Sequence, residues 1–181
     1  MAVYTKTGDK GETSLFDPKD QRLKRTPKDS CNIEAIGAVD ELDSFIGVTI
    51  SFSKDATVTK LLREVQVNLL TIGSILAGSG LRFSKTKTVK LEKKIDEIEG
   101  KLPVLKNFIL PGGTKLASHL HYCRSLARRA ERRVVALSKE KEVKAQVLMY
   151  VNRLSDFFFM LSRDENARVG NKETFWVGRK R

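Results

Sequence analysis

A polar segment that contains two glycines precedes every hydrophobic pattern in the chain. Between Tyr4 and the start of that pattern it collects residue types suited to an anion: Thr5, Thr7, Gly8, Lys10, Gly11 and Thr13. Glycine lets the backbone turn successive amides inward, lysine supplies positive charge, and threonine hydroxyls donate to an oxyanion or bind a phosphate-bound magnesium. The segment is not a Walker A loop, because Gly8 and Gly11 are three residues apart and no apolar strand precedes them. It predicts a phosphate-binding loop, and a tight polar turn without a ligand would have the same composition.

The overall composition indicates a globular chain with an anionic partner. Of its 181 residues, 40% are hydrophobic, which is enough for one domain with a buried core. Lysine and arginine number 34 against 22 aspartates and glutamates, so the net charge of +12 predicts a nucleotide or a nucleic acid as partner. No apolar run approaches the roughly 18 residues of a membrane span. Met1 also leads directly into polar sequence without the apolar core of a signal peptide. We therefore expect no membrane partner and a cytoplasmic location.

The metal-ligating residue types are too scattered to predict a metal held by the protein. Cys31 and Cys123 lie far apart, without a second cysteine or a histidine at metal spacing. His119 and His121 are two residues apart on an expected helix, so their side chains point about 160° apart. We expect no metal site and no disulfide, and reduced thiols fit the cytoplasm.

Apolar residues recur at three- and four-residue steps over most of the chain, which is the pattern of buried helical faces. We expect five helices, at residues 34–52, 57–77, 87–102, 114–139 and 143–168, the third of them peripheral. Glycines at 78 and 80 end the second, Pro103 ends the third and Thr114 caps the fourth. No strand pattern is convincing beyond a short one near Tyr4. The predicted fold class is all-α, a five-helix antiparallel bundle with an extended N-terminal arm.

This pattern predicts one domain in three parts. Residues 1–32 form the arm that carries the phosphate-binding loop, residues 33–170 form the bundle, and residues 171–181 form a C-terminal tail. The segment 107–113 runs three apolar residues into Pro-Gly-Gly, so it cannot continue a helix and must be a shaped connector.

Polar residues border the apolar stripes of the last two expected helices. On the fourth, Arg124, Arg128 and Glu131 share a face beside the core, whereas Arg129 and Arg133 point to the far, solvated side. On the fifth, a second polar and aromatic seam comprises Asn152, Asp156, Phe159 and Arg163. The two seams could form one cleft, and ion pairing between helices or subunits would explain the same residues.

Five sequence blocks, in this order and at this spacing, resemble the PduO-type ATP:cob(I)alamin adenosyltransferases. The blocks are TKTGDKGET at 5–13, EAIGAVDEL at 34–42, FILPGG at 108–113, RxxxRRAER at 124–132 and NRLSD at 152–156. The resemblance covers nearly the whole chain. One departure is Asn32, which stands where many members have an arginine.

The resemblance implies a homotrimer of five-helix bundles with active sites between neighbouring subunits. The reaction implied is transfer of the 5′-deoxyadenosyl group of ATP, accompanied by Mg²⁺, to reduced cobalamin with release of triphosphate. A reductase that donates the electron and a downstream adenosylcobalamin-dependent enzyme are the implied partners. The corrinoid is cobalamin or an incomplete precursor, and the basic loop 82–87 and the pair Phe175–Trp176 receive no role.

The resemblance also implies roles for particular residues. Thr5, Thr7, Gly8, Lys10, Gly11 and Thr13 would hold the triphosphate with help from Lys28, and Arg128, Glu131 and Asn152 would position the nucleotide. Asp40 would pair with Arg124 across the subunit boundary. Phe108 would fill the lower face of the corrin, displace the axial base and favour a four-coordinate cobalt(II) that is easier to reduce.

Two other classes of function fit parts of the sequence. A basic helical nucleic-acid-binding module would explain the charge and the arginines at 124–133, but arginines beside the core are poorly placed to read a groove. A structural trimer without catalysis would show damage in the phosphate loop or at Phe108, and both are intact.

Overall fold

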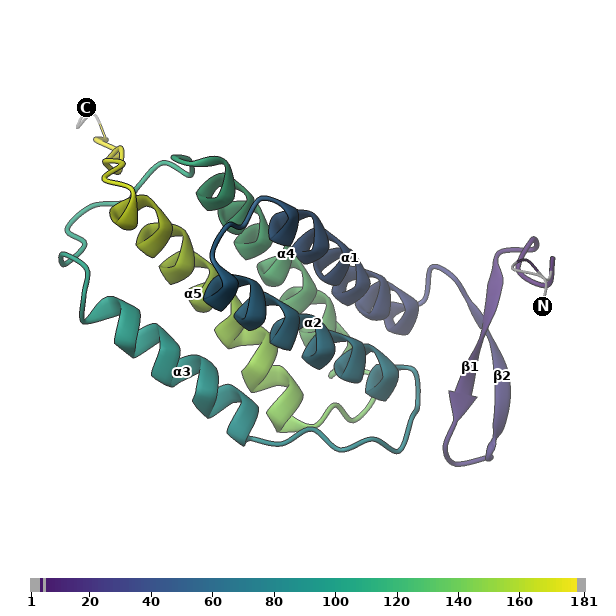
Figure 1. Cartoon of the computed structure of the whole chain (residues 1–181). Helices are drawn as coiled ribbons and strands as arrows, with labels where there is room; N and C mark the ends of the chain where they lie inside the picture. Colours follow the sequence, from purple (N-terminus) through teal and green to yellow (C-terminus); the bar gives the residue numbers. More distant parts are fainter. Residues whose placement is uncertain (1–3, 5, 179–181) are drawn as a thin grey trace.

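Five α-helices and one β-hairpin make up the described part of the chain, residues 4 and 6–178 of a computed structural model (Figure 1). The hairpin pairs β1 (Glu12–Asp17) with β2 (Arg22–Pro27). The helices are α1 (Cys31–Ser51), α2 (Ala56–Leu76), α3 (Thr86–Glu99), α4 (Lys115–Leu137) and α5 (Ala145–Arg168). The all-α bundle is therefore confirmed, and each helix begins and ends within about three residues of its expected position.

The helices pack in the spatial order α2, α1, α4, α5 and α3 (Figure 1). Helix α5 contacts both α4 and α3, so α3 lies at the edge of the bundle, the peripheral position expected for it. The largest side chains that are fully buried include Tyr150, Phe157, Phe158, Leu42, Ile46, Leu62 and Leu69. Their burial is the main source of stability, at about 1.5–3 kcal/mol for each large apolar side chain removed from water.

Side-chain caps fix where three of the helices begin. Ser30 accepts a hydrogen bond from the amide of Ile33 at the start of α1, and Thr114 accepts one from Ala117 at the start of α4. Asp55 caps α2 by accepting from the amides of Thr57 (2.7 Å) and Val58 (3.2 Å). These bonds satisfy amides that have no partner within the helix. The cap expected at Thr114 is confirmed.

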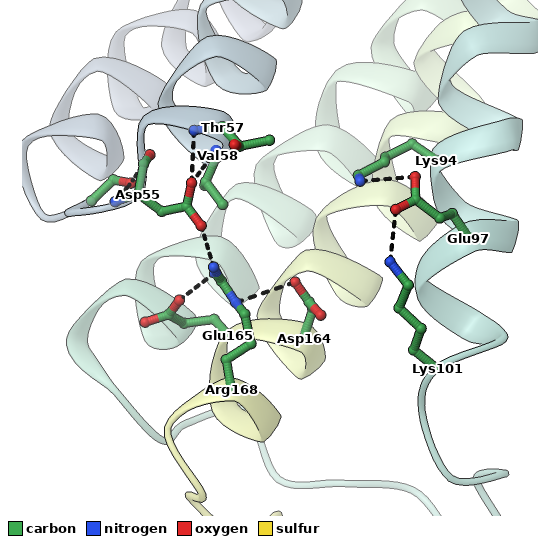
Figure 2. Close-up of polar contacts among 10 residues, drawn as sticks. Asp55, Thr57, Val58, Lys94, Glu97, Lys101, Asp164, Glu165 and Arg168 are labelled. Carbon is green, nitrogen blue, oxygen red and sulfur yellow. Dashed lines mark hydrogen bonds and ion pairs between the residues drawn. The ribbon is translucent and has the colours of Figure 1, made fainter.

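Asp55 also joins the start of α2 to the end of α5 (Figure 2). Arg168, in the last turn of α5, pairs with Asp55 and with two carboxylates of its own helix, Glu165 at 2.7 Å and Asp164 at 3.4 Å. The amide of Val58, followed by the neighbouring Arg168, lowers the pKa of Asp55. This cluster closes the end of the bundle farthest from the hairpin (Figure 1).

The hairpin corrects the expectation that the arm contains no strand beyond one near Tyr4. Strands β1 and β2 are antiparallel, with Thr13 opposite Thr26 and Phe16 opposite Leu23. Their side chains are mostly exposed, so the apolar alternation that marks a strand is weak in this sequence. A two-stranded hairpin is only marginally stable by itself. Figure 1 shows it projecting beyond the end of the bundle at which α1 begins.

One end of the hairpin touches the connector between α2 and α3. Gly78 has a φ of +102°, and a Cβ built there would collide with the backbone carbonyl of Phe16. Only glycine accepts both this backbone conformation and this close approach. Gly78 therefore ends α2 and leaves room for the hairpin at the same point.

No helix among residues 4 and 6–178 combines the length and the apolar character needed to cross a membrane.

Gly78→Ala should lower the free energy of unfolding by about 1–3 kcal/mol, because alanine strains the left-handed backbone and pushes against Phe16. Urea unfolding followed by circular dichroism measures the change. Gly80→Ala is the matched control, since a Cβ at Gly80 meets no atom within 4 Å. Equal stabilities of the two variants would show that position 78 does not require glycine.

Candidate active site

The predicted phosphate-binding loop is a compact turn held against the hairpin. The amide of Gly11 donates to the carbonyl of Gly8 at 3.2 Å, and Gly11 adopts a φ of +80°. From β2, Arg25 donates to the carbonyl of Thr7 at 2.7 Å. From the following turn, Lys28 Nζ donates to the carbonyl of Gly8 at 2.9 Å, and its amide donates to Gly11 at 2.9 Å. The loop is therefore shaped by contacts to its own hairpin.

The structure brings most of the predicted phosphate ligands into this loop. Thr7, Gly8, Lys10 and Gly11 lie in it, and Lys28 is joined to it directly. Thr13 lies just beyond, in β1. The predicted ligand Thr5 lies outside the described residues. The side chain of Lys10 is exposed, which leaves its ammonium group accessible to an anion.

The nucleotide-positioning residues predicted on α4 and α5 also meet. Asn152 Nδ2 donates to Glu131 Oε1 at 2.6 Å, so this pair joins α4 to α5 at the surface of the bundle. Arg128, one turn before Glu131 on α4, is exposed. Carboxylate, carboxamide and guanidinium groups can together bind the donors and acceptors of a base, a ribose or a phosphate.

Arg124 occupies a more buried position one turn earlier. Its side chain is half-buried, and its Nε is a buried atom without a hydrogen-bond partner among the described residues. Burial, followed by the positive charge of Arg128, lowers the pKa of Arg124. A guanidinium group held in this way favours a negatively charged partner.

Asp40 does not supply that partner within the same chain. It lies exposed on α1, where it lines a groove of about 280 Å³ between α1 and α2 together with Asp43, Leu69 and Gly73. Burial, and then the charge of Asp40, raise the pKa of Asp43. The neighbouring Glu41 points instead to α4, where it binds Arg129 at 2.7 Å. Asp40 therefore lies on the side of α1 that faces away from α4.

The arginines expected on the solvated side of α4 are partly exposed but paired. Arg129 binds Glu41, and Arg133 binds Glu34 of α1 at 3.4 Å. These exposed pairs connect α1 to α4 and contribute little stability each. In both pairs the guanidinium group binds a carboxylate of the same chain.

The seam predicted on α5 divides between two neighbours. Asn152 binds α4, whereas Asp156 and Phe159 line a groove between α5 and α3. Asp156 pairs with Arg153, which also binds Glu92 of α3 at 3.2 Å. The 100° spacing predicted one shared seam, and the structure corrects this: α5 packs between two helices, so Asn152 faces α4 whereas Asp156 and Phe159 face α3.

Phe108 is presented on an exposed edge of the connector between α3 and α4. Its side chain is 78% exposed, and its carbonyl accepts a hydrogen bond of 2.7 Å from the amide of Trp176. Leu110 donates to the carbonyl of Thr174 at 2.8 Å, so residues 108–110 and 174–176 pair as a short antiparallel bridge. The C-terminal tail is thus part of the structure that carries Phe108, which the sequence pattern did not indicate.

His121 is a buried residue of the α4–α5 interface that sequence reasoning considered only as a metal ligand. It is 3% exposed, its Nδ1 lies 3.4 Å from Ser162 Oγ, and its Nε2 has no partner among the described residues. Its ring lies 6.1 Å from that of Phe159. Burial, followed by the charge of Arg124, lowers the pKa of His121. The sequence did offer a sign of this burial, because residue 121 lies among apolar residues of α4, one turn before Arg124.

A basic loop beside a hairpin, a Glu131–Asn152 hydrogen bond between two bundle helices with Arg128 one turn away, and an exposed aromatic connector define a helical protein suited to nucleotide binding. Comparison with known proteins gives the family. The family description "cobalamin adenosyltransferase" matches residues 3–165, so the chain belongs to this family.

Two curated relatives cover nearly the whole chain. Corrinoid adenosyltransferase from Bacillus subtilis (strain 168) is 44% identical over 178 residues, which are 94% of this chain and 89% of the relative. Human corrinoid adenosyltransferase MMAB is 40% identical over 187 residues, covering 97% of this chain and 73% of the relative.

Solved structures agree with this assignment. A variant of a PduO-type ATP:corrinoid adenosyltransferase from Lactobacillus reuteri, complexed with cobalamin and ATP, superposes with a TM-score of 0.90 at 36% identity. The match covers 98% of this chain and 100% of that one. Another variant, complexed with ATP, gives a TM-score of 0.89 at 38% identity. The family and the fold class expected from the sequence blocks are confirmed, and the nucleic-acid-binding alternative finds no support.

The pKa of the His121 imidazole should lie below its ordinary value of 6.5. The unfolded chain then binds a proton at this residue at a higher pH than the folded chain does. The stability due to neutral His121 is therefore complete above about pH 6.5 and is lost as the pH falls through the lower, folded-state pKa. NMR of the imidazole signals measures this, and His119→Gln, which leaves one histidine in the chain, provides the assignment. A midpoint above 6.5 would contradict the burial argument.

Proposed function

We propose that this protein transfers the 5′-deoxyadenosyl group of ATP to the cobalt of a reduced corrinoid, giving adenosylcobalamin and triphosphate. The observation that carries the proposal is the match over 98% of the chain to an adenosyltransferase complexed with both cobalamin and ATP. The chain contains both the phosphate loop and the Phe108 connector that an active enzyme would need, which supports this proposal over a structural protein that has lost catalysis.

The chemistry needs no protein nucleophile. Cobalt(I) supplies the electron pair that forms the bond to the ribose C5′, and the C5′–O bond breaks with its pair leaving on triphosphate. The protein must align cobalt, C5′ and the leaving oxygen and must stabilise the charge on the triphosphate. Lys10, Lys28 and the loop amides are suited to the second task. Arg128, Glu131 and Asn152 are suited to holding the nucleoside in line.

The two nucleotide-binding regions are complementary but lie apart in one chain. The loop projects with the hairpin beyond the α1 end of the bundle, whereas the Glu131–Asn152 pair lies on α4 and α5 (Figure 1). One copy of the chain therefore does not enclose ATP by itself. We propose that the loop of one subunit reaches the α4–α5 surface of the next.

A closed ring of three subunits satisfies this arrangement with identical contacts. Two further features support contact between copies. The α1–α2 groove is mostly apolar, with Asp40 and Asp43 among its lining residues, and Arg124 of α4 has a buried donor atom without a partner among the described residues. An ion pair between Asp40 of one subunit and Arg124 of the next would give the buried Arg124 donor a partner and would cover the groove. The catalytic set we propose is thus Phe108, Arg128, Asp40 and Arg124.

Phe108 is suited to the lower face of the corrin because its ring is exposed and Ile109 and Leu110 follow it. An aromatic ring there would displace the axial base of cobalamin and exclude water, so that cobalt(II) becomes four-coordinate and easier to reduce. The corrin supplies the reactive cobalt, and the protein supplies its coordination environment.

The Mg²⁺ in this proposal arrives with ATP. The described residues contain no cluster of three or more histidine, cysteine or acidic side chains that could hold a metal. The ion would therefore take most of its ligands from phosphate and water, as Mg²⁺ commonly does. Thr7 in the loop and Thr13 just beyond it carry hydroxyl groups suited to contact the phosphate-bound ion.

We further propose a cytoplasmic location, a reductase as electron donor and an adenosylcobalamin-dependent enzyme as recipient of the product. Both cysteines are free, which suits a reducing compartment. The reaction itself requires an electron source before adenosyl transfer and an acceptor for a reactive cofactor after it.

Purified protein mixed with MgATP and chemically reduced cobalamin should give the absorption spectrum of adenosylcobalamin together with free triphosphate. The same preparation titrated with generic DNA and RNA should show only weak, salt-sensitive binding. Absence of the adenosylcobalamin spectrum under reducing conditions would refute the proposal.

Lys10→Ala and Phe108→Ala should affect different steps, the first ATP binding and the second turnover from cobalt(II). A hydrogen bond to a charged group contributes about 1.5–3 kcal/mol. Lys10→Ala should therefore lower the affinity for ATP about tenfold or more. Phe108→Ala should keep ATP affinity but lose turnover that starts from cobalt(II). Calorimetry with ATP and a cob(II)alamin assay measure the two effects. Wild-type ATP affinity in Lys10→Ala would refute the phosphate role, and unchanged cobalt(II) turnover in Phe108→Ala would refute the corrin role.

A further inference from the structure

The connector that carries Phe108 is fixed to α5 at both ends. At its start, Arg163 Nη2 donates to the carbonyl of Pro103 at 3.0 Å. At its end, Asn166 Nδ2 donates to the carbonyl of Gly112 at 3.1 Å, and Asn166 Oδ1 accepts from the amide of Thr114 at 3.1 Å. Arg163 and Asn166 are 5% and 3% exposed and lie about one turn apart on α5. One buried face of α5 thus anchors both ends of the connector.

The C-terminal tail is attached to the same face. Arg163 Nε donates to Glu173 Oε1 at 2.8 Å, and Nη2 donates to Glu173 Oε2 at 3.4 Å. Thr174, the next residue, accepts from Leu110, and Trp176 donates to Phe108. Glu173 therefore fixes the tail immediately before the residues that pair with the connector.

Packing alone does not explain why a charged pair occupies this position. The side chains of Arg163 and Glu173 are only 6% and 16% exposed. A pair that is removed from water seldom stabilises a fold more than well-packed apolar residues would. The advantage of the pair is a fixed geometry, because a guanidinium group that binds both oxygens of a carboxylate fixes the relative orientation of the two side chains. Phe108 needs such support, since its ring is 78% exposed and has little packing to hold it.

We propose that the Arg163–Glu173 pair is a positioning device for Phe108. Arg163 holds the connector through Pro103 and the tail through Glu173, and the tail then holds the backbone of Phe108 through Trp176. This inference rests on the proposed function, in which the Phe108 ring controls the axial ligand of cobalt. Neither Arg163 nor Glu173 touches the reacting atoms, so both act through Phe108.

The test uses three variants of the full chain: Glu173→Gln, Arg163→Met and the double variant. Electron paramagnetic resonance of cob(II)alamin bound with MgATP measures the four-coordinate fraction. Turnover is measured from cob(II)alamin with reduced flavin mononucleotide and, separately, from cobalamin already reduced to cobalt(I) by titanium(III) citrate. Urea unfolding and ATP calorimetry report stability and nucleotide binding.

Glu173→Gln should lower the four-coordinate fraction and slow cobalt(II) turnover about tenfold, a loss in the range caused by a displacement of less than 1 Å at a reacting centre. ATP affinity and turnover from cobalt(I) should stay within about twofold of wild type. The double variant contains no unpaired buried charge, so it should regain stability relative to Arg163→Met. It should not regain the four-coordinate signal.

Recovery of the four-coordinate signal and of cobalt(II) turnover in the double variant would overturn the proposal, because the pair would then act only on stability. Unchanged cobalt(II) turnover in Glu173→Gln would also overturn it. Glu97→Gln is the matched control. Glu97 of α3 pairs at the surface with Lys94 of the same helix and with Lys101 just after it (Figure 2), so this variant should behave as wild type.

Phe108→Ala separates this inference from the role of Phe108 itself. If Phe108→Ala loses cobalt(II) turnover and Glu173→Gln does not, the positioning role alone fails. If Phe108→Ala keeps full cobalt(II) turnover, the proposed function of Phe108 fails and the positioning role fails with it.

Discussion

The packing of α5 between α4 and α3 is the constraint on which the rest of the structure depends. A helix with neighbours on both sides must bury two stripes, and α5 does so with large residues such as Tyr150, Phe157 and Phe158. Polar side chains of α5 bind the elements packed around it. Asn152 meets α4 near the start of α5, while Arg163 and Asn166 bind the connector near its end.

This arrangement separates the groups predicted to bind the nucleotide from the aromatic connector. The Glu131–Asn152 pair lies at the surface between α4 and α5, and the predicted phosphate-binding loop lies next to the hairpin beyond the bundle. A single chain holds each part in shape through its own contacts but does not close them around a ligand. Assembly of copies, as proposed, would bring a preformed loop to a preformed seam at little cost in chain ordering.

The helices could be predicted because each buries a stripe with a regular period. Residues such as Leu62, Leu69 and Ile72 recur at helical spacing and are fully buried. The hairpin could not be predicted in this way, because most side chains of β1 and β2 face solvent and give no apolar alternation. Its position depends on a long-range approach of Phe16 to Gly78, which no local pattern encodes.

The same limit applies to the site. The sequence by itself determined which groups exist and which share a helical face: the basic glycine loop, Arg124, Arg128 and Glu131 on α4, and Asn152 on α5. Only the tertiary structure decided which faces meet, so that Asn152 joins Glu131 while Asp156 turns to α3. It alone placed residues 174–176 beside 108–110 and Glu173 on Arg163. Helical period is a property of residues within a few positions of one another, whereas these contacts join residues 10 positions apart (Arg163 and Glu173), 21 apart (Asn152 and Glu131) or on separate segments (108–110 and 174–176), and packing in three dimensions selects them.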